Sequence, residues 1–185
     1  CLDGDDKIHN HYLDRVATAV SADPSLRLVY ANQEFHFEAF GRFVGQWVVP
    51  AFSQQHALLE GPLPVPSVFH RDLWLAAGGF NPSLPWGSED WLFWLSLSRF
   101  APRTKNIGGA PMVYYRIRKA GKRAKKDKYQ EYLPMLRTMF PDLYPVAQLL
   151  RDHDDIVSQI HADTLAYIDD RILPAYPEYP MPYVW

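Results

Sequence analysis

The first six residues of the chain include three carboxylates, Asp3, Asp5 and Asp6. An Asp-x-Asp pair at the end of a strand can place two carboxylates near one point, because alternate side chains of a strand share a face. Hard oxygen donors suit Mg²⁺ or Mn²⁺, and such ions often bind through few carboxylates together with substrate phosphates. The cluster is therefore a candidate site for a divalent cation, and the alternative is a solvated turn that binds nothing.

A second pair of carboxylates, Glu89 and Asp90, opens an almost wholly apolar segment over residues 91–100. Ser88 can cap a helix there, and negative charge in the first turn of a helix is favoured by the helix dipole. Because the segment is apolar on nearly every side, we expect this helix to be buried. The pair then either takes a proton in a cleft or acts as an N-terminal cap without chemistry.

The elements that must position these carboxylates alternate between helix and strand. Helical spacing of apolar residues predicts a helix over 8–21, and alternation predicts a strand over 26–30. Residues 31–62 have no clean period, and we expect a loop with one or two short helices there. Further expected elements are a Pro-rich extended lead over 61–66, a strand over 67–69, a helix over 72–77 that ends at Gly78-Gly79, a strand over 112–115, and helices over 124–138 and 143–172.

Length and composition exclude several classes of protein. The chain has 185 residues, a net charge of −2 and 48% hydrophobic residues, which excludes disorder as its main state. No run approaches the ~18 consecutive apolar residues of a membrane span. The single cysteine, Cys1, excludes an internal disulfide framework and a zinc site with several thiolates. The near-neutral charge argues against a general nucleic-acid binder.

The stretch from Gly78 to Trp91 reads Gly-Gly-Phe-Asn-Pro-Ser-Leu-Pro-Trp-Gly-Ser-Glu-Asp-Trp and resembles the acceptor-side segment of inverting glycosyltransferases with the GT-A fold. Family 2 enzymes commonly show Gly-Gly-Phe, a short loop and then Glu-Asp-Trp, and the Trp-Gly-x-Glu-Asp form at 86–90 looks like the galactosyltransferase version. In these families the Asp-x-Asp cluster lies upstream and a strand ending in Tyr-Tyr-Arg, here 114–116, lies downstream. The resemblance covers residues 1 to about 120 and implies an α/β chain, a partial GT-A fold with a mixed sheet and flanking helices.

The resemblance implies a role for each residue of these motifs. Asp90 would be the general base that takes the proton of the acceptor hydroxyl. Asp5 would be the main ligand of Mn²⁺ or Mg²⁺, and Asp3 would contact the ion or the nucleotide. For Trp91 we expect core packing, with a contact to a sugar ring as the alternative. The other residues implied to bind the donor are Arg116 and Arg118, and those implied to bind the acceptor are Trp86, Gly87, Glu89 and Trp91.

One position departs from the pattern of the family. Relatives often carry His two residues after Tyr-Tyr-Arg, where it can bind the ion or touch the diphosphate, and here that position is Arg118. Arginine cannot ligate a metal, but its planar guanidinium suits phosphate. Either Arg118 supplies positive charge to the diphosphate directly, or this protein depends less on a metal.

Eight basic residues crowd the segment 116–128, opposed only by Asp127. The segment would be a flexible lid over the donor diphosphate, a contact to an anionic membrane surface, or a solvated loop and helix start. No interleaved aromatic residues or known motif supports nucleic acid as a partner. We expect a cytoplasmic protein, with peripheral membrane contact if this segment binds lipid.

The sequence thus predicts an inverting, metal-assisted glycosyltransferase that moves a sugar from a nucleotide donor, with UDP favoured, to a saccharide or lipid-linked hydroxyl. The nucleotide-binding half of a GT-A fold precedes the Asp-x-Asp motif, so we expect residues 1–121 to be the acceptor-side half, with the missing N-terminal half or a complementary chain as partner. Residues 122–173 are expected to form a helical C-terminal extension, and 174–185 an extended tail rich in Pro and Tyr. The alternative function is a non-catalytic carbohydrate- or partner-binding module that keeps the acceptor cleft.

Overall fold

The computed structural model describes residues 1–59, 61–82, 89–118, 135–143 and 145. The chain forms two compact units, Cys1–Arg116 and Ile117–Trp185. Residues 135–139 are helical and belong to the second unit. Most of the expected helical extension, the expected tail over 174–185 and the basic segment from residue 119 onward lie outside the described residues.

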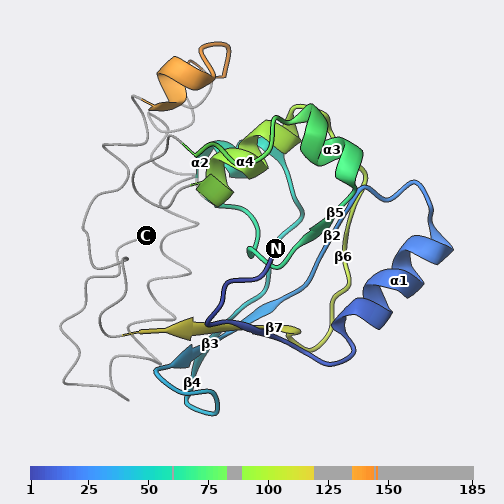
Figure 1. The fold of residues 1–185 in the computed structure, drawn as a ribbon, viewed down its shortest axis with the longest axis vertical. Helices are drawn as coiled ribbons and strands as arrows, with labels where there is room; N and C mark the ends of the chain where they lie inside the picture. The colour runs from blue at the N-terminus through green and yellow to red at the C-terminus, as the bar shows by residue number, and fades with distance from the viewer. Residues whose placement is uncertain (60, 83–88, 119–134, 144, 146–185) are drawn as a thin grey trace. The chain divides into compact units, whose positions relative to one another are not determined.

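The first unit is an α/β structure with two sheets (Figure 1). One sheet has four strands in the order β1-β7-β3-β4, and the other has three in the order β5-β2-β6. In the second sheet β2 pairs parallel with β6 and antiparallel with β5, so this sheet is mixed, as the sequence predicted. The elements in chain order are β1 (Lys7–Ile8), α1 (Tyr12–Ala22), β2 (Leu28–Tyr30), β3 (Gln33–Phe37), β4 (Phe43–Trp47), α2 (Gln54–Leu59), β5 (Val68–Phe69), α3 (Arg71–Ala76), α4 (Glu89–Ser98), β6 (Thr104–Asn106) and β7 (Val113–Ile117).

The strand β2 separates two hydrophobic clusters, because successive side chains of a strand point to opposite faces. Val29 packs with the buried face of α1, which includes Tyr12 and Val16. Leu28 and Tyr30 pack on the other side, with buried aromatic side chains of α4. Figure 1 shows α1 on one side of the three-stranded sheet and α3 and α4 on the other. The strand predicted over 26–30 is thus confirmed over Leu28–Tyr30, and its side chains enter both clusters.

The region that had no clean period contains a β-hairpin. β3 and β4 pair antiparallel, with Phe35 opposite Gly45. Gly41 lies in the loop between them with a φ of 101°, a conformation that glycine adopts without steric cost. The expectation of a loop with short helices is therefore wrong over 33–47 and correct at α2, which is one short helix.

The segment before α1 is a strand rather than the first turn of the predicted helix. Ile8 pairs with Val113, and Lys7 pairs with Tyr114, in the antiparallel β1–β7 ladder. The helix expected from residue 8 therefore begins at Tyr12. Ile8 fits the helical spacing, but its backbone pairs with β7, which lies in sequence at the carboxyl-terminal end of the first unit.

The helix α3 ends in a Schellman motif at Gly78 and Gly79, as the sequence predicted. The N–H of Gly78 donates to the carbonyl oxygen of Leu75 at 3.2 Å, and the N–H of Gly79 donates to that of Trp74 at 3.0 Å. Both glycines have positive φ, 82° and 69°. A Cβ at Gly78 would meet open space, whereas a Cβ at Gly79 would lie 2.8 Å from Cζ2 of Trp74.

We expect Gly79→Ala to destabilise the first unit more than Gly78→Ala does. Alanine at either position costs about 1–2 kcal/mol for the left-handed backbone. At Gly79 the contact with the Trp74 indole adds about 1–3 kcal/mol to this cost. Urea unfolding followed by circular dichroism measures both variants, and equal midpoints would show that the indole moves aside without cost.

Candidate functional site

The acidic cluster forms a turn that precedes β1 and is attached to β7. The N–H of Asp6 donates to the carbonyl oxygen of Asp3 at 3.1 Å, which closes the turn. Asp6 is buried, with 9% of its surface exposed, and its carboxylate accepts a hydrogen bond of 2.9 Å from the N–H of Arg116. Asp3 is exposed and Asp5 is half-buried. The sequence suggested that the cluster lies at the end of a strand, whereas the structure places it in a turn. Asp6 joins this turn to the strand that carries Arg116.

The side chain of Arg116 has partners of its own. Its guanidinium lies over the ring of Phe40, with Cζ 4.6 Å from the ring centroid, and Nζ of Lys7 lies 4.2 Å from the same centroid. Nε of Arg116 is buried and has no hydrogen-bond partner among the described residues. Sequence reasoning selected Arg116 but missed Lys7 and Phe40. The position of Lys7 directly after the acidic cluster was the signal that could have identified it.

The start of α4 holds the second pair of carboxylates. Asp90 is half-buried, and its Oδ1 accepts a hydrogen bond of 2.8 Å from the N–H of Trp91. Glu89 is exposed. The indole N–H of Trp91 donates to the carbonyl oxygen of Ala57 at 2.7 Å, which ties the start of α4 to α2. These contacts orient the Asp90 carboxylate and give Trp91 a structural role.

The remainder of α4 is a buried apolar helix, as the sequence predicted. The ring of Phe93 packs against those of Phe69 and Phe80, with centroid distances of 5.0 and 4.5 Å. The buried residues of this helix are Leu92, Phe93, Trp94, Leu95, Leu97 and Ser98. A helix packed in this way holds its first turn in a constant place relative to the core, which is the support that a catalytic side chain needs.

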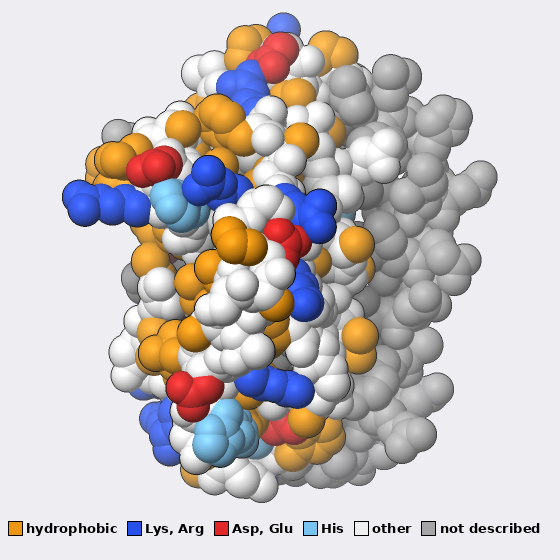
Figure 2. Space-filling view, turned by 90° about the vertical axis from the view of Figure 1, so that its right-hand side faces the viewer, with side chains coloured by type: hydrophobic (Ala, Val, Ile, Leu, Met, Phe, Trp, Pro, Cys, Tyr) orange, Lys and Arg blue, Asp and Glu red, His pale blue; other side chains and the backbone are white. Residues whose placement is uncertain are grey.

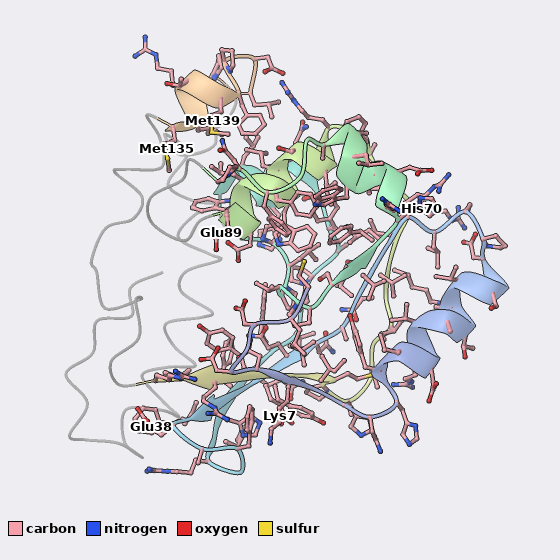
Figure 3. The ribbon with its side chains drawn as sticks, viewed as in Figure 1. Lys7, Glu38, His70, Glu89, Met135 and Met139 are labelled. Carbon is pink, nitrogen blue, oxygen red and sulfur yellow. The ribbon has the colours of Figure 1, made fainter. Side chains whose placement is uncertain are left out.

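The described residues include most of the predicted site. The acidic turn lies against the strand that carries Arg116, and the second pair of carboxylates starts α4. Arg118 is exposed and belongs to the second unit, and Trp86 and Gly87 lie outside the described residues. In the view of Figure 1 the amino terminus is drawn between α4 and β7, and Figure 3 shows Glu89 at the amino-terminal end of α4. The two groups of carboxylates therefore come from separate elements of one compact unit.

Asp3 and Asp5 are the residues on which a divalent cation would depend. Among the residues that the structure describes, no three His, Cys, Asp or Glu side chains are grouped so that they could hold a metal ion. Two carboxylates suit an ion such as Mg²⁺ that completes its coordination with water and substrate phosphates, because this ion is seldom enclosed by protein ligands alone. The donor set therefore fits an ion that binds together with a diphosphate and does not fit a structural metal.

The four-stranded sheet also carries a pair formed by buried His36 and partly exposed Glu34, next to a tyrosine. Nδ1 of His36 accepts a hydrogen bond from the N–H of Gly41 at 3.2 Å, so the ring proton is on Nε2 and is donated to Oε2 of Glu34 at 3.0 Å. Burial raises the pKa of Tyr114 above its usual range, and the charge of Glu34 adds to the rise. Tyr114 is therefore a neutral hydroxyl at physiological pH.

Three kinds of group occur on the first unit: carboxylates that suit a cation, basic side chains that suit a phosphate, and a half-buried carboxylate at a helix start that suits a proton. Within the described part of the chain, no helix has the length and apolar character that crossing a bilayer requires. Neither a scan of the sequence against protein-family models nor a search among curated proteins found a match.

Proposed function

We propose that the protein is an inverting, metal-assisted glycosyltransferase with a partial GT-A fold, which transfers a sugar from a nucleotide donor, with UDP favoured, to a saccharide or lipid-linked hydroxyl. The observation that supports this best is the hydrogen bond of 2.9 Å between the Asp6 carboxylate and the Arg116 N–H. It joins the Asp-x-Asp cluster to the Tyr-Tyr-Arg strand, two motifs of the resemblance that are distant in sequence. A donor diphosphate needs both, carboxylates for its cation and a guanidinium for its oxygens.

Asp90 is the proton acceptor in this proposal. The oxygen of the acceptor hydroxyl forms a bond to the anomeric carbon as the bond from that carbon to the diphosphate breaks, and the hydroxyl proton passes to the Asp90 carboxylate. The N–H of Trp91 holds Oδ1 of Asp90 at 2.8 Å, which keeps the carboxylate oriented for this transfer. Attack from the side opposite the leaving group inverts the anomeric configuration.

The remaining residues of the site bind and orient. Asp3 and Asp5 would hold Mn²⁺ or Mg²⁺, and Lewis-acid stabilisation of the diphosphate charge is what such an ion supplies when bound. Glu89 is exposed at the start of α4 and would bind a hydroxyl of the acceptor. Arg116 would contact the diphosphate, because a guanidinium meets phosphate oxygens with two parallel hydrogen bonds. The resemblance implies the same role for Arg118, which belongs to the second unit.

Sugar transfer from a panel of UDP-sugars, measured on the protein expressed from its complete reading frame, tests the proposal. We expect UDP release that depends on an added saccharide, and a product of inverted anomeric configuration by NMR. EDTA should lower the rate at least about tenfold and Mn²⁺ should restore it, because the ion contributes several kcal/mol to the transition state. A smaller loss would mean that Arg118 replaces much of the charge of the ion.

The same assay separates the proposed enzyme from a binding module. Binding of a saccharide without UDP release from any donor would contradict the proposed enzyme and support a non-catalytic carbohydrate-binding module. The proposal of membrane contact depends on residues 116–128, most of which lie outside the described residues. On the face shown in Figure 2, acidic and basic side chains are interspersed among apolar ones.

A further inference from the structure

Lys7, Phe40 and Arg116 form an aromatic–cation cluster beside the acidic turn. Nζ of Lys7 lies 4.2 Å from the centroid of the Phe40 ring, and Cζ of Arg116 lies 4.6 Å from it. The negative face of an aromatic ring attracts a cation, and one ring here attracts two. Two like charges thus lie within 4.6 Å of one ring centroid, an arrangement that a bound anion would stabilise.

Three elements of the first unit converge to build the cluster. Lys7 pairs with Tyr114 across β1 and β7, and Arg116 lies on the same face as Tyr114 because alternate residues of a strand share a face. Phe40 comes from the loop between β3 and β4, where its ring lies 5.7 Å from that of buried His36. Residues far apart in sequence therefore meet through strand pairing.

The loop that carries Phe40 is constrained by its backbone. Gly41 and Glu38 have positive φ, 101° and 56°, and the N–H of Gly41 donates to Nδ1 of His36 at 3.2 Å. A positive φ at a residue other than glycine is uncommon and persists where the surrounding structure requires it. Figure 3 labels Glu38 in this loop and Lys7 on β1. Phe40 is thus presented in one place.

Neither cation of the cluster is paired with a carboxylate of the residues that the structure describes. The carboxylates of the neighbourhood have other partners, since Asp6 accepts the N–H of Arg116 and Glu34 accepts the ring proton of His36. Nε of Arg116 is buried, and no described group accepts its proton. The cluster therefore presents two positive charges directly beside the turn that would hold the cation.

We propose that the aromatic–cation cluster binds the diphosphate of the nucleotide donor, an inference that rests on the proposed function and adds Lys7 and Phe40 to the donor site. Arg116 meets the phosphate oxygens with its planar fork, and Lys7 adds a point charge. Phe40 is a positioning residue, because its ring holds both cations and touches no phosphate. The two basic residues and the ion of the acidic turn then share the charge of the leaving group.

Titration calorimetry with inorganic pyrophosphate and with UDP, at low ionic strength and with EDTA present, tests the cluster without a metal. We expect Lys7→Met to weaken binding about tenfold, because a hydrogen bond to a charged group contributes at least that factor. Phe40→Leu should weaken binding by up to about tenfold, because it removes the ring face that holds both cations in place. Phe40→Tyr keeps the aromatic face and should bind within about twofold of wild type. Lys105→Met removes an exposed cation beside Arg15 of α1 and should leave binding unchanged.

A steady-state assay separates a role of Lys7 in donor binding from a purely structural role, because only donor binding changes KM for the donor without changing kcat. In Lys7→Met we expect KM for the donor to rise about tenfold and kcat to stay within about threefold, because the cluster binds the diphosphate before and during transfer. Lys7→Arg should restore most of the affinity, since it restores the charge. Loss of kcat alone in Lys7→Met would contradict a role in donor binding.

The inference is overturned if neither pyrophosphate nor UDP binds the wild-type chain, or if Lys7→Met and Phe40→Leu bind as the wild type does. Equal losses in Phe40→Tyr and Phe40→Leu, with unchanged thermal unfolding, would remove Phe40 as a positioning residue. The binding outcomes do not depend on Asp90. If the wild type transfers sugar and Asp90→Asn does not, the proposed function stands even where the role of the cluster is rejected. If the wild type binds pyrophosphate or UDP but transfers sugar to no acceptor, the proposed glycosyltransferase function is rejected. The proposal that the cluster binds a nucleotide-sugar donor is then rejected as well.

Discussion

Asp90→Asn should lower kcat for sugar transfer by about 10²–10⁴-fold, the range that general acid–base catalysis contributes. An amide cannot take the proton of the acceptor hydroxyl. Its carbonyl oxygen can still accept the N–H of Trp91, which Oδ1 of Asp90 accepts at 2.8 Å. The start of α4 should therefore keep its structure, and the loss should appear in kcat and not in donor affinity. Rates of UDP release at saturating donor and acceptor measure it.

Two further variants separate proton transfer from an effect on a helix terminus. Asp72 is an exposed carboxylate in the first turn of α3, and Asp72→Asn should leave transfer unchanged. Glu89→Gln should raise KM for the acceptor about tenfold with little change in kcat, because a hydrogen bond to a charged group is replaced by a neutral one. Full activity in Asp90→Asn would exclude this carboxylate as the base.

Asn32→Ala should lower the free energy of unfolding of the first unit by about 3 kcal/mol, because it leaves buried polar groups without partners. Asn32 is 6% exposed, and its Oδ1 accepts the N–H of Val49 at 3.1 Å and Nδ2 of Asn106 at 3.0 Å. Its own Nδ2 donates to the carbonyl oxygen of Gly109 at 3.2 Å. Urea unfolding followed by circular dichroism gives the difference.

The position of Asn32 explains why this effect should be large. The residue lies between β2 of one sheet and β3 of the other, and its carbonyl oxygen accepts the N–H of Met112 at 3.1 Å, just before β7. Asn10 is exposed in the turn before α1, and Asn10→Ala should change the free energy of unfolding by no more than about 0.5 kcal/mol. Equal midpoints for the two variants would show that water replaces the Asn32 amide.

Local patterns in the sequence were enough to predict those helices and strands whose type and end depend on residues within the element itself. The apolar run after Asp90 predicts a buried helix, and α4 is one. Gly78 and Gly79 predict the end of α3, because both need a left-handed backbone that glycine adopts readily. Alternation over 26–30 predicts β2, whose side chains enter two different clusters. In each case the residues that decide the structure lie within one element.

Elements that depend on a distant partner could not be predicted in this way. Ile8 fits the helical spacing of α1, yet it pairs with Val113. β6 (Thr104–Asn106) contains no hydrophobic residue and is a strand because its backbone pairs with β2. Aromatic residues on both faces of the β3–β4 hairpin hide the alternation that would have revealed it.

The same division holds for the candidate site. The sequence by itself selected the carboxylates, because residue type decides which side chains can bind a cation or take a proton. Only the tertiary structure decided that Asp6 attaches the acidic turn to Arg116, and that Lys7 and Arg116 meet on Phe40. The partners Asp6 and Arg116 are 110 positions apart, and such contacts depend on strand register and loop closure, which no local pattern encodes.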